Sequence, residues 1–230
     1  MPIGSAKLGF WYTQPISDTI NLPPQVQFPN GGFESGTTGW TVINSRIQLN
    51  GGTTILGEVT PTDPTPRPYS SPGEATSISS ESYNYNLDTT DIPPTGGTQC
   101  LRLVNNGVVN SFGLLYGPAV YSINTVIADA GDKISFWWRA IGSSDAYNIY
   151  AYLLDPTKSG SNKYIQLIRA TAAAGGTQTA WAEASVIIQP NQVGNYHFVF
   201  INGSYDASGG TVVGAELKID MVQRYQAGTY

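Results

Sequence analysis

Apolar and polar residues alternate most regularly in the middle of the chain, in two neighbouring segments. In residues 133–140, Ile134, Phe136 and Trp138 share one face, and the residues between them share the other. After a turn rich in Gly and Ser, residues 147–154 alternate in the same way. A period of two is typical of half-buried β-strands, and two such strands need a second apolar sheet to pack against.

Further strands are predicted by the same alternation and by the turn residues that separate the segments. They are expected at residues 33–34, 40–49, 98–104, 119–127, 163–171, 181–188, 196–202 and 215–222. In the last segment, the face expected in the core carries Ala215, Leu217, Ile219 and Met221. The sequence therefore predicts an all-β fold, an antiparallel two-sheet jelly-roll sandwich.

Two parts of the chain depart from the strand pattern. Residues 1–29 contain one apolar cluster, Phe10-Trp11-Tyr12, and several prolines, so we expect an extended N-terminal arm ahead of a jelly-roll domain at residues 30–230. The cluster either anchors the chain on a neighbouring subunit or belongs to a first strand folded back on the sandwich. Residues 51–97 are rich in Thr, Pro and Ser, and we expect a long surface insertion there.

Composition narrows the function classes. The chain has 230 residues, a net charge of -5 and 12% charged residues. It lacks the basic patch of a nucleic-acid-binding protein, and no apolar run reaches membrane-spanning length. The N-terminus shows no signal peptide, and the single cysteine, Cys100, excludes a disulfide within the chain. We therefore expect no nucleic-acid partner and no membrane insertion.

Candidate chemistry favours binding over catalysis. The single histidine, His197, lies beside apolar strand residues, and no nucleophile, zinc or phosphate-binding motif is present. We therefore expect no catalytic residues and no enzyme activity. Sugar binding relies on exposed aromatic rings with polar groups nearby. Trp137, Tyr150 and Tyr152 lie off the predicted core faces and are candidates for such a site. Trp181 and Asn148 could contribute to the same site. Alternatively, the same rings lie in the core or in subunit contacts.

Several stretches carry a family resemblance. NGGFESGTTGW at residues 30–40, AGDKISFWWRAIG at residues 130–142 and KIDMV at residues 218–222 resemble the galactose-binding-like β-jelly roll of carbohydrate-binding modules. More narrowly, AYNIYAYLLD and TAWAEASVII are similar to modules in virion structural proteins of tailed phages, particularly marine and cyanobacterial ones. The similarity covers residues 30–222 apart from the insertion, and it specifies fold better than function.

The resemblance implies a structural calcium ion where the Phe33-Glu34 segment meets the final strand, with Glu34 and Asp220 as oxygen ligands. The family often has a second acid at the end, where this chain has Met221. It also implies a non-enzymatic virion protein on a tail, fibre or head, made in the host cytoplasm. Such a protein would form a homo-oligomer and contact other virion proteins through its arm. The alternatives are a receptor adhesin for a host-surface glycan and a non-catalytic module associated with glycan-active enzymes.

Overall fold

The computed structural model describes residues 26–49, 61–68, 82–106, 114–142, 146–172, 178–205 and 215–230. Two short 3-10 helices, η2 (Gly160–Lys163) and η3 (Pro190–Gln192), accompany the strands. The strands are β1 (Val26–Gln27), β2 (Trp40–Leu49), β3 (Pro61–Pro68), β4 (Ser82–Asp88), β5 (Cys100–Asn106), β6 (Leu114–Ser122), β7 (Val126–Ala128), β8 (Lys133–Ile141), β9 (Ala146–Leu154), β10 (Tyr164–Ala172), β11 (Ala182–Ile187), β12 (Gly194–Tyr205) and β13 (Ala215–Tyr225).

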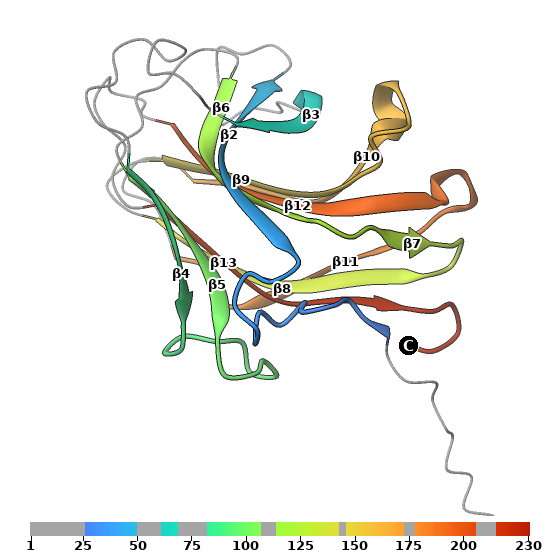
Figure 1. Cartoon of the computed structure of the whole chain (residues 1–230), viewed down its shortest axis with the longest axis horizontal. Helices are drawn as coiled ribbons and strands as arrows, with labels where there is room; N and C mark the ends of the chain where they lie inside the picture. Colours follow the sequence, from blue (N-terminus) through green and yellow to red (C-terminus); the bar gives the residue numbers. More distant parts are fainter. Residues whose placement is uncertain are drawn as a thin grey trace, which may run out of the picture.

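Two antiparallel sheets pack face to face as a sandwich (Figure 1). Sheet A has the strand order β11-β8-β13-β5-β4, with β1 beside β13, and sheet B has the order β10-β9-β12-β6-β2-β3, with β7 beside β12. The predicted all-β sandwich is confirmed. Within the described residues, no helix has the length and apolar character needed to cross a membrane.

Aromatic rings from both sheets fill the core. Phe136 of sheet A meets Phe200 of sheet B edge-to-face, with ring centroids 4.9 Å apart. Trp40 lies 6.0 Å from Phe200 and 5.1 Å from Phe33. Each of these rings is at most 5% exposed, so the predicted inner faces of β8 and β12 are confirmed. Burying such rings supplies the largest apolar areas that side chains offer.

The two central strands do not lie side by side. β8 pairs with β11 and β13 in sheet A, whereas β9 pairs with β10 and β12 in sheet B. The chain therefore crosses from one sheet to the other between them. Alternation along a strand shows that one face is buried, but it does not identify the neighbouring strand.

Three details of the strand prediction were wrong. The segment predicted as one strand at residues 119–127 is divided between the end of β6 and β7, with residues 123–125 between them. Residues 33–34 lie in turns between β1 and β2, where Phe33 has a φ of 54°. In β13 the register shifts between Asp220 and Gln223, and Met221 has a φ of 51°. This β-bulge inserts an extra residue, so the core position expected for Met221 belongs to Val222, which is 1% exposed.

The sandwich extends into both segments that were expected to stand apart. β1 pairs with β13, and Phe28 is 5% exposed, so the last residues of the expected arm belong to the sandwich. Phe10, Trp11 and Tyr12 lie outside the described residues. Within the expected insertion, β3 and β4 form the outer strands of sheets B and A. Edge strands need few aliphatic residues, because they bury less surface than central strands.

Candidate functional site

One asparagine organises the loop between β1 and β2. The side-chain NH2 group of Asn30 donates to two loop carbonyl oxygens at 2.9 and 2.8 Å, and the backbone carbonyl of Asn30 accepts the indole N–H of Trp40 at 3.0 Å. Gly31 lies so close to the Val222 carbonyl that a Cβ atom would clash with it. These contacts position the loop, and with it Glu34, beside the bulge of β13.

A cavity of about 430 Å³ opens between this loop, β13 and residues 95–97. Glu34 lines the cavity, together with Gly32 and Gly96. Gly96 lies so close to the fully buried Asp220 carboxylate that a Cβ atom would stand 2.5 Å from Oδ2, whereas a Cβ atom on Gly32 would make an ordinary contact with Oδ1 at 3.6 Å. The structure thus brings together Glu34 and Asp220, which are 186 positions apart in the chain by their numbering.

The two carboxylates differ in their environments. Asp220 Oδ1 accepts the Met221 N–H at 2.7 Å, whereas no donor in the described part of the chain reaches Asp220 Oδ2. Burial, and then the negative charge of Glu34, raise the pKa of Asp220 to about 7. Hydrogen bonds from the Thr98 hydroxyl and backbone, at 2.6 and 2.8 Å, lower the pKa of Glu34.

This carboxylate pair fits a hard divalent cation. A buried carboxylate oxygen without a donor, next to a second carboxylate, is a costly arrangement that a cation relieves. Each carboxylate oxygen that accepts one hydrogen bond still has a lone pair for a metal. In the described ranges no three His, Cys, Asp or Glu side chains gather as a metal-binding group. Backbone carbonyls, hydroxyls or water would therefore complete the coordination shell.

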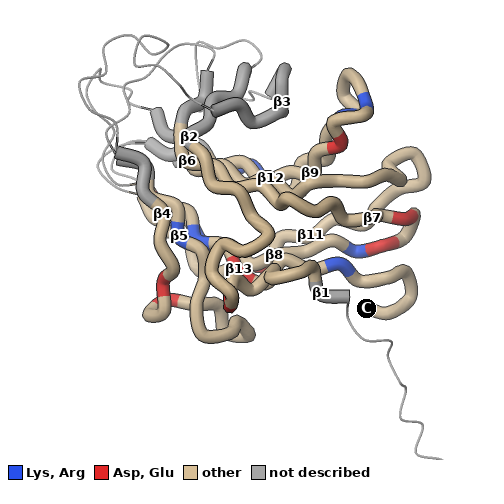
Figure 2. Tube along the Cα trace, in the orientation of Figure 1, with Lys and Arg blue, Asp and Glu red and all other residues tan. Residues whose placement is uncertain are grey.

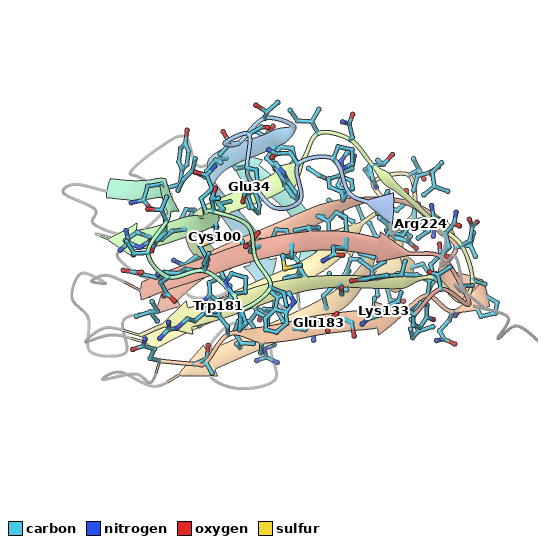
Figure 3. The ribbon with its side chains drawn as sticks, turned by 90° about the horizontal axis from the view of Figure 1, so that it is seen from below. Glu34, Cys100, Lys133, Trp181, Glu183 and Arg224 are labelled. Atoms are coloured by element: carbon cyan, nitrogen blue, oxygen red, sulfur yellow. The ribbon has the colours of Figure 1, made fainter. Side chains whose placement is uncertain are left out.

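Two tryptophans lie on the outer face of sheet A, near its β11 edge; we call this pair, Trp137 and Trp181, the tryptophan shelf. Trp137 pairs with Glu183 across the β8–β11 ladder, and it points outward because Trp138 packs against the core. Trp181 precedes β11 by one residue and shares the face of Glu183. Both shelf residues are half-buried. Figure 3 shows Trp181, Glu183 and Lys133 following one another along this edge.

Asp91, in the loop between β4 and β5, fixes one end of the shelf. Its Oδ1 accepts the indole N–H of Trp181 at 2.9 Å and a guanidinium N–H of Arg139 at 2.7 Å. Arg139 also donates to the Thr179 carbonyl at 3.0 Å, which ties the segment before β11 to β8. The other Asp91 oxygen accepts a hydrogen bond from Lys218 at 2.6 Å.

A row of basic side chains crosses sheet A beside the shelf. Arg139, Lys218 and Arg102 occupy paired positions on β8, β13 and β5, and Figure 2 shows basic positions around β5 with acidic positions nearby. The Lys218 side chain, 5% exposed, donates to Asp88 and Asp91 at 2.6 Å each. Burial is the largest single influence and opposes the ionised carboxylates. The hydrogen bonds from Lys218, those from Thr90 to Asp88 and from Trp181 to Asp91, and the nearby positive charges together outweigh it and lower the pKa of Asp88 and of Asp91. The charges next to the shelf therefore cancel in pairs.

The other predicted sugar-binding residues lie on the opposite sheet. Tyr150 and Tyr152 project from the outer face of β9, where each is 1% exposed and packs in a second apolar cluster with Val199 and Ile201. Rings buried this completely offer no face to a sugar. The backbone of Asn148 pairs with Gly203 within sheet B, and the side chain of Asn148 is not among those that the structure describes. The five predicted residues therefore do not form one site.

His197 and Cys100, the single histidine and the single cysteine, have structural roles in the sandwich. The His197 ring nitrogen Nδ1 lies 2.7 Å from the Ser122 carbonyl oxygen, which requires a proton on that nitrogen. Cys100 is buried, and burial raises the pKa of its thiol to about 12. A thiol that stays protonated at neutral pH is a poor nucleophile.

Sequence reasoning did not identify Asp91, Arg139 or Glu183 as companions of the tryptophans. Arg139 and Glu183 follow from the strand pattern once the β8–β11 pairing is known, because residues of one face alternate. Asp91 belongs to the Thr/Pro/Ser-rich range, where no periodic signal fixes its neighbours. Its only local signal is the run Asp88-Thr89-Thr90-Asp91, which is typical of a turn.

No protein-family model matches this chain, and neither does any curated protein. Among solved structures, a carbohydrate-binding module of the β-sandwich superfamily matches with a TM-score of 0.44 and 12% identity, over 84% of this chain and 60% of that one. TmCBM61, solved with β-1,4-galactotriose, matches with a TM-score of 0.47 and 11% identity, over 88% of this chain and 99% of that one. The neighbours of this fold include carbohydrate-binding modules.

A phage protein is also among the structural neighbours. The enzymatically active domain of bacteriophage CBA120 tailspike protein 4 matches with a TM-score of 0.43 and 13% identity, over 86% of this chain but only 21% of that one. Likenesses at this level concern the β-sandwich and carry no argument about ligands, partners or location. Function must be argued from the side chains of this chain.

Proposed function

We propose that this chain is a non-catalytic carbohydrate-binding module and that its glycan site is the tryptophan shelf on sheet A. The observation that carries the proposal is the half-buried Trp181 on the same sheet face as Trp137, with Asp91 accepting a hydrogen bond from its indole N–H. Aromatic faces accept the C–H face of a pyranose ring, and polar groups around them bind its hydroxyls. A ring held by a hydrogen bond loses little conformational entropy when a sugar binds.

The charges around the shelf favour a neutral glycan. Arg139 is paired with Asp91 at 2.7 Å, and Lys133 is paired with Glu183 at 2.9 Å. An anionic sugar would have to compete with these carboxylates for the cations, at a cost in hydrogen bonds to charged groups. Sugar hydroxyls can instead donate to the remaining carboxylate lone pairs without breaking either ion pair.

A titration of neutral polysaccharides and a glycan array tests the proposal. Trp181→Ala and Trp137→Ala should each weaken binding at least tenfold, as is common for central aromatic contacts. Tyr230→Ala serves as the control, because Tyr230 is 56% exposed and its described contacts are with Gly131 and Tyr225 and not with the shelf residues. Absence of any glycan binding by the unchanged chain would contradict the proposal. Equal loss in the Tyr230 variant would contradict the assignment to the shelf.

Display on a tailed-phage particle remains a prediction from the sequence resemblance. The predicted anchor, Phe10-Trp11-Tyr12, lies outside the described residues, and no described contact bears on assembly. We propose glycan binding as the activity and receptor adhesion as the role it would serve on a particle. Mass spectrometry of purified phage particles tests incorporation of the chain separately from sugar binding. It compares the full chain with a version that lacks residues 1–25.

We also propose that Glu34 and Asp220 hold a structural calcium ion. The supporting observation is the buried Asp220 Oδ2, which no described donor reaches, beside a second carboxylate. A bound divalent cation would compensate both negative charges and join the loop after β1 to β13. Asp220 pairs with Trp137 across the β13–β8 ladder, so the ion would lie beside the shelf, and we propose that it stabilises the fold there.

A further inference from the structure

The outer edge of β4 differs from the other three edges of the sandwich. β3 contains four prolines, β10 contains Arg169 and a register shift, and β11 carries a charge, Glu183, as its second residue. Prolines, bulges and charges on an edge strand prevent another strand from pairing with it. The β4 sequence, SYNYNLD, has none of these features before its final Asp88.

One side chain of β4 is exposed on a face that is otherwise buried. Tyr85 pairs with Leu103, and Leu87 pairs with Leu101, so all four positions face the inside of the sandwich. Both leucines of β5 are fully buried, yet Tyr85 is 51% exposed. In the described part of the chain, β4 pairs with β5 on one side and with no strand on the other.

We propose that β4 pairs with β4 of a second copy of this chain, as an antiparallel dimer centred on Tyr85. In that register Tyr85 lies opposite its own copy, and Asn84 lies opposite Asn86. Asp88 lies opposite Ser82, so no like charges meet. Asp88 is already bound to Lys218 at 2.6 Å. Cross-strand aromatic pairs stabilise antiparallel ladders, and like charges directly opposite destabilise them.

The dimer joins two copies of sheet A into one continuous sheet. A two-fold axis between antiparallel strands keeps equivalent faces on the same side of the joined sheet, so both tryptophan shelves belong to one sheet face. Trp137 on β8 is then seven strand spacings from its copy, roughly 34 Å across the strands at about 4.8 Å per spacing. The sheet twist of about 20° per strand turns the two shelves away from each other, so the dimer would join separate glycan chains and bind a branched glycan coat with avidity. This consequence rests on the proposed function, whereas the pairing itself does not.

Sedimentation of the full chain without glycan tests the pairing. We expect a species of twice 24.6 kDa. Tyr85→Lys and Tyr85→Glu should each raise the dimer dissociation constant at least tenfold, because like charges would face each other at the two-fold axis. Mixing these two variants should restore a dimer, since Lys then faces Glu. This rescue occurs only in the proposed register, and it requires that both variants are folded.

Ile127→Lys is the matched control, because Ile127 is 60% exposed and lies on β7, away from β4. It should leave the dimer unchanged. If the chain without substitutions stayed monomeric at about 100 µM, the pairing would contribute less than about 5.5 kcal/mol, and the proposal would be overturned. A dimer that persists in Tyr85→Lys, or a mixture of the two variants that stays monomeric, would also overturn it.

Discussion

The Asp91 carboxylate joins Trp181 to Arg139 through a single oxygen atom, at 2.9 and 2.7 Å. This oxygen connects the loop after β4 to the segment before β11, at the opposite edge of sheet A. The orientation of Trp181 therefore depends on a residue 90 positions away in the chain. A ring that is positioned in this way is already held in one orientation before a ligand binds, so binding costs little conformational entropy.

Replacing Asp91 should reduce both glycan affinity and stability. Asp91→Ala removes the acceptor of Trp181 and one partner of Lys218, so we expect a loss of about 2 kcal/mol in unfolding free energy and a several-fold weaker glycan affinity. Asp129→Ala is a suitable control, because the Asp129 side chain is 65% exposed in its ion pair with Arg224. Urea denaturation and calorimetric titration measure the two effects. If Asp91→Ala bound the glycan with unchanged affinity, the hydrogen bond that orients Trp181 would not contribute to binding.

Neighbouring tryptophans on β8 should respond oppositely to truncation. Trp138 packs against the core, whereas Trp137 faces outward. Trp138→Ala should cost about 3 kcal/mol of stability because it leaves a cavity. Trp137→Ala should cost less than about 1 kcal/mol while abolishing most glycan binding. Thermal denaturation and binding assays on both variants decide the point, and a large stability loss in Trp137→Ala would show that its ring is structural.

The strand faces were predictable because they depend on local alternation. Phe136, Phe198 and Phe200 recur at a period of two, and each is fully buried as expected. Strand partners were not predictable in the same way. β8 and β9 follow each other closely and still lie in opposite sheets, because pairing is decided by contacts between distant segments.

The candidate site shows the same division between local and distant information. Outward positions of Trp137 and Tyr152 were correctly inferred from alternation, but only one of these rings is accessible. Tyr152 packs against Tyr164 of β10 with ring centroids 5.9 Å apart. The sequence pattern of β9 alone does not predict this partner on the neighbouring strand. Glu34 and Asp220 were paired by family resemblance, which carries distant information that periodicity lacks.

The buried Lys218 should make the protein sensitive to acid. Asp88 and Asp91 have lowered pKa values, so their contribution to stability is complete above about pH 4 and is lost as the pH falls through their folded-state values. Lys218→Met should cost about 3 kcal/mol at pH 7, because Asp88 loses its Lys218 partner and Asp91 keeps only Arg139. It should also flatten the acid-induced loss of stability. Denaturant midpoints at pH 7, 4 and 3 test this, and an unchanged acid slope in the variant would contradict it.

Calcium should stabilise the protein through Asp220, with a pH dependence of defined sign. The pKa of Asp220 is raised to about 7, so the calcium-free folded state holds a proton that the unfolded state releases near pH 4. Stability without calcium should therefore fall as the pH rises from 4 towards 7, by up to about 4 kcal/mol from this group. A cation must displace that proton, so calcium should raise Tm more at pH 8 than at pH 5.

The calcium effect has a direct chemical control. At 100 times its dissociation constant, the ion should add about 2.7 kcal/mol to the unfolding free energy, and a chelator should reverse the gain. Asp220→Asn keeps the size of the side chain but removes the charge that binds the ion and the proton. In that variant both the calcium response and the loss of stability between pH 4 and 7 should disappear together. If calcium raised the Tm of Asp220→Asn as much as that of the unchanged chain, the ion would be bound elsewhere.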